Sequence, residues 1–133
     1  MRVYLDTNVV VSAVATRGLC ADVLQAIVAE HDLVVGEAML SELRRILAQK
    51  LGLPKEIVEE TEGFLRRQGT VVEAKTTQPI RGLDAADATV VAEAVAGAAD
   101  LLVTGDHGLL GARGLPINTI APRELWDRLR RAT

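Results

Sequence analysis

Two aspartates stand directly after short apolar segments of the chain. Asp6 ends the segment at residues 3–5, and Asp106 follows residues 101–103 after two intervening residues. If both segments are strands of one parallel sheet, their carboxylates lie at its carboxyl edge, where such sheets bind ligands. Carboxylate oxygens are hard ligands that suit magnesium or manganese, ions that can also bind a substrate phosphate directly. The two positions therefore indicate metal-assisted chemistry on a phosphate.

Two further acids share the apolar side of predicted helices. Glu42 lies three residues after Met39 and four before Ile46, and Asp87 lies three residues before Val90. An ionised carboxylate that faces a core is costly unless it is paired, and a metal ion would pair both. One or two ions held by all four acids could activate water, orient a phosphodiester and stabilise the leaving oxygen.

Structural explanations of the helical acids remain open at this point. Asp84 is predicted to cap the helix that contains Asp87, and an aspartate in a first helical turn often serves the helix dipole. Glu42 could reach solvent or pair with a distant arginine. The convergence of four acids on one site is what favours the metal.

Other polar residues could support this chemistry. Asn8 and Thr104 could hydrogen-bond a ligand carboxylate or the attacking water, or serve instead as a helix cap and a turn residue. His107 follows Asp106 and would be a candidate general base or metal ligand, but the sequence places no partner histidine nearby. We assign no role to His31. Cys20 is interpreted as a buried thiol rather than a nucleophile.

The elements that must position these residues alternate along the chain. Apolar runs typical of buried strands occur at 3–5, 33–35, 70–72, 101–103 and 117–120, separated by segments with helical spacing. The helix at 85–96 is expected to turn Val90, Val91, Ala94 and Val95 inward, and Pro54 is expected in the first turn of another helix. The pattern predicts one α/β domain over residues 1–133, with a parallel sheet of about five strands and helices on both faces.

Composition agrees with a single domain whose core contains few aromatic residues. The 133 residues are 49% hydrophobic but only 2% aromatic, and the single cysteine excludes an internal disulfide. Without an apolar stretch of membrane-span length or a signal-peptide pattern, we expect a cytoplasmic protein. The net charge of −3 becomes −3 + 4 = +1 if four acids belong to one metal site, so nucleic acid is not excluded. The arginines could form solvated helix faces or a phosphate track.

Several segments together resemble PIN domains. VYLDTNVVVSA is similar to the first strand and helix of that family, and VGEAMLSELRRIL to its second motif. LDAADATVVAEAVAGAADLLVTGD, followed by HGLL, resembles the third and fourth acidic motifs, and INTIAPRELWDRL the last strand and helix. The resemblance covers nearly the whole chain in the family's order.

The resemblance implies a metal-dependent endoribonuclease. Many PIN proteins of this size are VapC-like toxins of type II toxin–antitoxin pairs, which usually form homodimers and are inhibited by a small antitoxin. Carried over, the magnesium or manganese ligands would be Asp6, Glu42, Asp87 and Asp106, supported by Asn8 and Thr104. The family often has another aspartate two positions after the fourth acid, where this chain has Gly108.

Other functions are compatible with parts of the pattern. A degenerate PIN module would bind RNA or a protein without cutting. A phosphatase of the haloacid dehalogenase class would use Asp6 as nucleophile, but its second aspartate is replaced by Asn8. A response-regulator receiver would need paired acids near the first strand and a lysine after the last strand, and both are missing.

Overall fold

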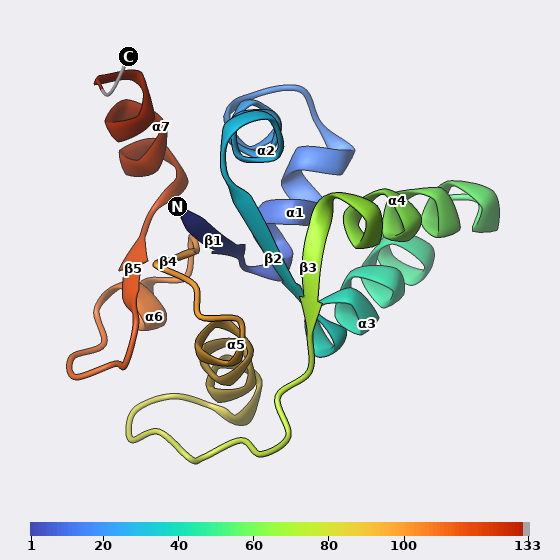
Figure 1. The fold of residues 1–133 in the computed structure, drawn as a ribbon. Coiled ribbons are helices and arrows are strands. Elements are labelled where there is room, and N and C mark those ends of the chain that lie inside the picture. The colour runs from blue at the N-terminus through green and yellow to red at the C-terminus, as the bar shows by residue number, and fades with distance from the viewer. Residues whose placement is uncertain (132–133) are drawn as a thin grey trace.

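A five-stranded parallel sheet organises the chain (Figure 1). The structure is a computed structural model that describes residues 1–131, so the last two residues of the predicted domain lie outside the described part. The strands are β1 (Arg2–Leu5), β2 (Asp32–Gly36), β3 (Gly69–Val72), β4 (Leu101–Val103) and β5 (Asn118–Ile120). Their order is β3-β2-β1-β4-β5, and every neighbouring pair is parallel. The predicted α/β class and the five-stranded parallel sheet are confirmed.

Helices separate the strands and cover both faces of the sheet. They are α1 (Thr7–Ala15), α2 (Leu19–Glu30), α3 (Glu37–Arg45), α4 (Lys55–Gln68), α5 (Ala85–Ala96), α6 (His107–Leu110) and α7 (Pro122–Arg131). A π-helical turn, η1 (Ile46–Lys50), extends α3 and contains a hydrogen bond of 3.0 Å from the Leu51 amide to the Ile46 carbonyl. Helices α1 to α4 lie on one side of the sheet, and α5 and α6 lie on the other (Figure 1).

The central strand β1 fixes where the two halves of the sheet meet. Tyr4 pairs with Val34 of β2 on one side and with Leu102 of β4 on the other. From β1 the chain moves outward to β3, then returns across the sheet to β4 and moves outward again to β5. Because such crossovers are right-handed, this reversal sends helices to opposite faces and opens a crevice beyond the carboxyl ends of β1 and β4.

Aliphatic side chains fill the space between the layers. Val3, Tyr4 and Leu5 of β1 are fully buried, since the central strand of a doubly covered sheet meets solvent on neither face. The surrounding core is made of valine, leucine, isoleucine and alanine, as the composition predicts, together with Met39. Burial of these side chains holds the two layers of helices on the sheet.

Two local predictions differ from the structure. Val95 was expected to face inward but is 46% exposed, whereas Glu93, for which no role was predicted, is 2% exposed. The inward face of α5 is therefore rotated from the one that its valines suggest. Pro54 precedes the first residue of α4 and occupies its N-cap rather than its first turn.

Within the described residues, no single helix is long and apolar enough to cross a membrane. Helices α1 and α2 meet that test only as a pair bent by 105°.

Candidate active site

The carboxylate of Asp6 is held rigidly at the end of β1. Its backbone amide still belongs to the sheet and donates to the Val103 carbonyl over 2.9 Å. Its side chain caps α1 by accepting from the Thr7 amide at 2.7 Å, and it accepts from the Thr104 hydroxyl at 2.8 Å. Only 9% of the residue is exposed. Asp6 therefore presents one fixed carboxylate to the crevice.

Thr104 connects Asp6 to the loop that follows β4. The hydroxyl of this fully buried residue donates a hydrogen bond to Asp6 and accepts one from the Asp106 amide at 3.0 Å. Asp106 in turn caps the short helix α6, since its Oδ1 atom accepts from the Leu109 amide at 3.1 Å. One hydroxyl thus sets the relative position of the two strand-end aspartates.

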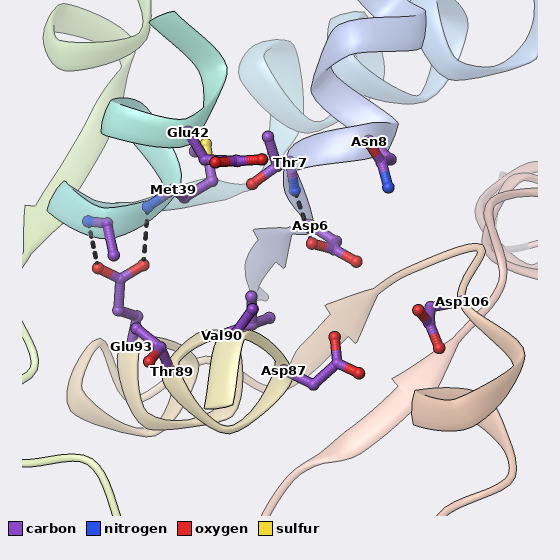
Figure 2. A pocket seen from close by; sticks show the side chains of 12 residues that line it. Asp6, Thr7, Asn8, Met39, Glu42, Asp87, Thr89, Val90, Glu93 and Asp106 are labelled. Carbon is purple, nitrogen blue, oxygen red and sulfur yellow. Dashed lines mark hydrogen bonds between the residues drawn. The ribbon is translucent and has the colours of Figure 1, made fainter. Parts of the chain in front are cut away.

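Asp87 reaches the same space from the opposite layer. It lies in the first turn of α5, where Asp84 is the N-cap, as predicted, and accepts from the Asp87 amide at 2.8 Å. The Asp87 side chain extends from α5 toward the space between Asp6 and Asp106 (Figure 2). Three elements, β1, α5 and the loop after β4, therefore bring three carboxylates around one crevice.

The crevice disfavours the ionised forms of Asp6 and Asp87. Burial raises the pKa of Asp6, with a smaller contribution from the charge of Asp106, although the hydrogen bonds from Thr104 and Thr7 oppose the rise. Burial also raises the pKa of Asp87, and the charges of Asp106, Asp84 and Asp6 add to that rise. A bound cation would relieve this repulsion.

Glu42 lines the same cavity, but its side chain does not point toward the core as predicted. Its side chain is 45% exposed instead of facing the core, and it forms a two-point ion pair with Arg45. Arg45 Nη2 lies 2.6 Å from Glu42 Oε1, and Nε lies 3.1 Å from Oε2. The hydrogen bonds from Arg45 lower the pKa of Glu42, so this acid is already neutralised by a neighbour one helical turn away.

A cavity of about 370 Å³ is lined by all four predicted acids, Asp6, Glu42, Asp87 and Asp106. Among residues 1–131, however, no three acidic, histidine or cysteine side chains are close enough to hold an ion in their present conformations. The donor set fits magnesium or manganese, because all four residues offer hard oxygen atoms. For all four to bind a metal together, Glu42 would have to leave Arg45.

The other predicted residues have less direct places in the site. Asn8 lines the cavity from an exposed position in α1, and no hydrogen bond joins it to an acid in the described chain. His107 is exposed at the start of α6, and Cys20 is partly buried in α2. The phosphatase alternative needs an acid at the position of Asn8, which the chain does not have.

Sequence reasoning missed Glu93 and Tyr4. The Tyr4 hydroxyl donates a hydrogen bond to the buried Glu93 carboxylate over 2.6 Å. Burial raises the pKa of Tyr4 above its ordinary value, and the charge of Glu93 adds to that rise. Figure 2 shows Glu93 pointing from α5 to the first turn of α3. A signal was present, since Glu93 and Asp87 are the two charged residues in a helix of otherwise small or apolar residues.

Comparison with known proteins agrees with this architecture. One chain in the crystal structure of VapBC2 from Rickettsia felis bound to a DNA fragment from their promoter superposes with a TM-score of 0.66 at 15% identity. The alignment covers 91% of the present chain and 98% of that chain. PAE2754 from Pyrobaculum aerophilum gives a TM-score of 0.63 at 18% identity, covering 98% and 90% of the two chains. At these identities the similarity shows a shared fold.

A search of curated proteins gives no match. The family model described as PIN domain matches residues 2–108, a segment that contains all four predicted acids. Since this match covers most of the sequence and the fold agrees with it, the chain belongs to the PIN domain family.

Proposed function

We propose that this protein is a metal-dependent endoribonuclease. PIN domains are generally nucleases, and the observation that carries the proposal is the convergence of Asp6, Asp87 and Asp106 on one crevice. The raised pKa values of Asp6 and Asp87 are the mark of acids that a cation would stabilise in their ionised form. A single-stranded RNA is the proposed substrate.

Magnesium or manganese is the proposed cofactor. Asp6, Asp87 and Asp106 would hold it, and Glu42 would join them after release from Arg45. When bound, such an ion lowers the pKa of a coordinated water and stabilises charge on the phosphodiester oxygens.

The residues of the chain contribute orientation around that ion. Thr104 keeps one lone pair of Asp6 engaged, so the carboxylate presents its remaining oxygen lone pairs in a fixed direction. Asn8, exposed at the rim of the cavity, is placed to donate an amide hydrogen bond to an RNA phosphate oxygen. Arg45 released from Glu42 would add a positive charge at the same rim.

The biological setting that we propose is a toxin–antitoxin pair. A structural neighbour belongs to a complex named VapBC2, which supports a small antitoxin protein as the partner of the present chain. We further propose a homodimer or higher homo-oligomer, and action in the cytoplasm, where a lone cysteine such as Cys20 stays reduced.

Cleavage of a labelled single-stranded RNA tests the enzymatic proposal. We expect slow cleavage with magnesium or manganese, none in excess chelator, and recovery when the metal is added back. Asp6→Asn and Asp87→Asn should each abolish cleavage, whereas Asp32→Asn, an exposed aspartate at the opposite edge of the sheet, should retain it. Cleavage that survives in chelator or in a folded Asp6→Asn variant would show that the metal-nuclease proposal is wrong.

A non-catalytic PIN module is the second candidate, and the ion pair between Glu42 and Arg45 favours it. Glu42 is already neutralised by this pair, and among the described residues no three acids are grouped tightly enough for an ion. A protein that binds single-stranded RNA equally well with metal and with chelator, and cleaves it under neither condition, would have this function.

A further inference from the structure

Glu93 is a buried acid that accepts hydrogen bonds from two other structural elements. It is 2% exposed on α5, and its carboxylate accepts from the Ala38 amide at 2.6 Å and the Met39 amide at 3.3 Å, both in the first turn of α3. The same carboxylate accepts from the Tyr4 hydroxyl of β1 at 2.6 Å. All three donors point at one carboxylate, so within residues 1–131 its oxygens are satisfied by hydrogen bonds and by no ion pair.

The first turn of α3 depends on this carboxylate because it has no cap of its own. The N-cap residue is Gly36, which has no side chain to bind the free amides of the first turn. A Cβ atom placed on Gly36 would overlap the Glu93 carboxylate. The glycine therefore leaves room for a cap that is supplied by another helix.

The elements that meet at Glu93 also carry three of the four acids of the site. Helix α3 carries Glu42, α5 carries Asp87 six residues before Glu93, and Asp6 directly follows the end of β1, two residues after Tyr4. Figure 2 shows the Glu93 carboxylate directed to α3, on the opposite side of the cavity from Asp106. A shift of α3 or α5 at this contact would move Glu42 or Asp87 relative to Asp6.

We propose that Glu93 is a positioning residue that fixes α3, α5 and β1 relative to one another and thereby sets the geometry of the acidic site. The role that this gives to the acids rests on the proposed function. Glu93 itself is not a metal ligand, because its oxygens are engaged by Ala38, Met39 and Tyr4. Outer partners of this kind change metal affinity without contacting the ion.

A simple helix cap and a positioning residue can be separated by moving the cap. The parent protein for this test carries Tyr4→Phe, because the Tyr4 hydroxyl would lose its acceptor when Glu93 is removed. In this parent, Glu93→Ala removes both the cap and the connection between α5 and α3. Adding Gly36→Ser then restores a cap from within α3, since the backbone of Gly36 is already extended (φ −115°, ψ 151°) as an N-cap requires. The space for the serine side chain is the space that the Glu93 carboxylate leaves.

Two measurements are made on these three proteins. Calorimetry gives the manganese affinity. Electron spin resonance gives the distance between spin labels on two introduced cysteines at exposed positions, Ser41→Cys in α3 and Ala96→Cys in α5. The natural cysteine is removed by Cys20→Ser. We expect Glu93→Ala to lower the melting temperature, weaken manganese binding about tenfold and broaden the label distance. Gly36→Ser should recover the melting temperature but neither the affinity nor the narrow distance.

The outcomes distinguish this proposal from the function on which it rests. Recovery of manganese affinity or of the narrow distance by Gly36→Ser would reduce Glu93 to a helix cap and overturn the proposal. If the parent binds no manganese, the metal site is wrong, and the label distance alone decides the role of Glu93.

A milder variant covers the case in which Glu93→Ala does not fold. Glu93→Gln keeps the size of the side chain, but its amide nitrogen cannot accept a hydrogen bond from the α3 amides or from a tyrosine. A broadened distance and weaker manganese binding are expected from this variant too. If Glu93→Gln has the same manganese affinity and the same label distance as its parent, the positioning role is contradicted.

Discussion

Replacing Thr104 by valine removes one hydroxyl from the centre of the site and nearly preserves the shape of the side chain. The residue is fully buried, so no water can replace the lost group from bulk solvent. Two hydrogen bonds disappear together, one to the Asp6 carboxylate at 2.8 Å and one from the Asp106 amide at 3.0 Å. The variant therefore isolates the contribution of the link between the two strand-end aspartates.

The expected magnitude follows from the character of those bonds. A hydrogen bond to a charged group contributes about 1.5–3 kcal/mol and a neutral one about 0.5–1.5 kcal/mol, so their loss should cost about 2–4 kcal/mol. Since 1 kcal/mol shifts the melting temperature of a domain of this size by roughly 4 °C, we expect a fall of about 8–16 °C at neutral pH. Thr104→Ser keeps the hydroxyl and loses one methyl group, which costs only about 1 kcal/mol.

The effect should also depend on pH. Burial raises the pKa of Asp6 in the folded protein, and the hydrogen bond from Thr104 opposes that rise. An acid with a raised folded pKa destabilises the fold above that pKa, and the cost is relieved as the pH falls through it toward the unfolded value. Without the hydroxyl the pKa of Asp6 rises further, so relief begins at a higher pH in Thr104→Val. The difference from the unmodified protein should therefore shrink on acidification.

Thermal unfolding of the metal-free proteins between pH 7.5 and pH 4 measures both quantities, with Thr104→Ser as the matched control. If Thr104→Val has the same melting temperature as the unmodified chain at pH 7, the reasoning is refuted. So would a gap that stays constant to pH 4, since it would show that the ionisation of Asp6 is not involved.

Three further variants test the electrostatics of the site. Asp87→Asn should raise the melting temperature of the metal-free protein at neutral pH, where the raised pKa of Asp87 makes its charge costly, and should reduce the stabilisation by manganese in thermal scans. Gly108→Asp should tighten manganese binding in calorimetry, because it adds a carboxylate beside the site at a position without a positive φ. The Asp106 Oδ1 atom, 2.9 Å from the new Cβ, would have to shift within its cap of α6; two tight sites in the unmodified chain would contradict this. Arg45→Gln should also tighten manganese binding, because it releases Glu42 from its ion pair, and an unchanged affinity would show that the pair does not compete with the metal.

The fold was predictable because its three inner strands, β2, β1 and β4, are short and mostly apolar. The runs 33–35 and 101–103 contain no polar residue and are buried, a pattern typical of the inner strands of a parallel sheet. Polar residues then mark the strand ends directly, as Asp6 and Thr104 do. The position of these residues follows from topology and needs no knowledge of side-chain conformation.

The direction of helical side chains was harder to predict. Helical spacing placed Val95 inward and Glu42 against the core, but the packing of α5 on α3 turns Glu93 inward instead. Arg45 was visible three residues after Glu42, yet the choice between an ion pair and a metal depends on side-chain rotation that spacing does not determine. The cap that Glu93 gives to α3 joins residues more than fifty positions apart, which no local pattern contains.

Anomalous scattering from crystals soaked in manganese tests the central claim most directly, because it locates the ion without assuming an activity. We expect a peak between the carboxylates of Asp6, Asp87 and Asp106, with Glu42 turned away from Arg45 toward the ion. The same soak of Asp87→Asn should give a much weaker peak. A crevice without manganese at saturating concentration, or an ion bound to other residues only, would contradict the account.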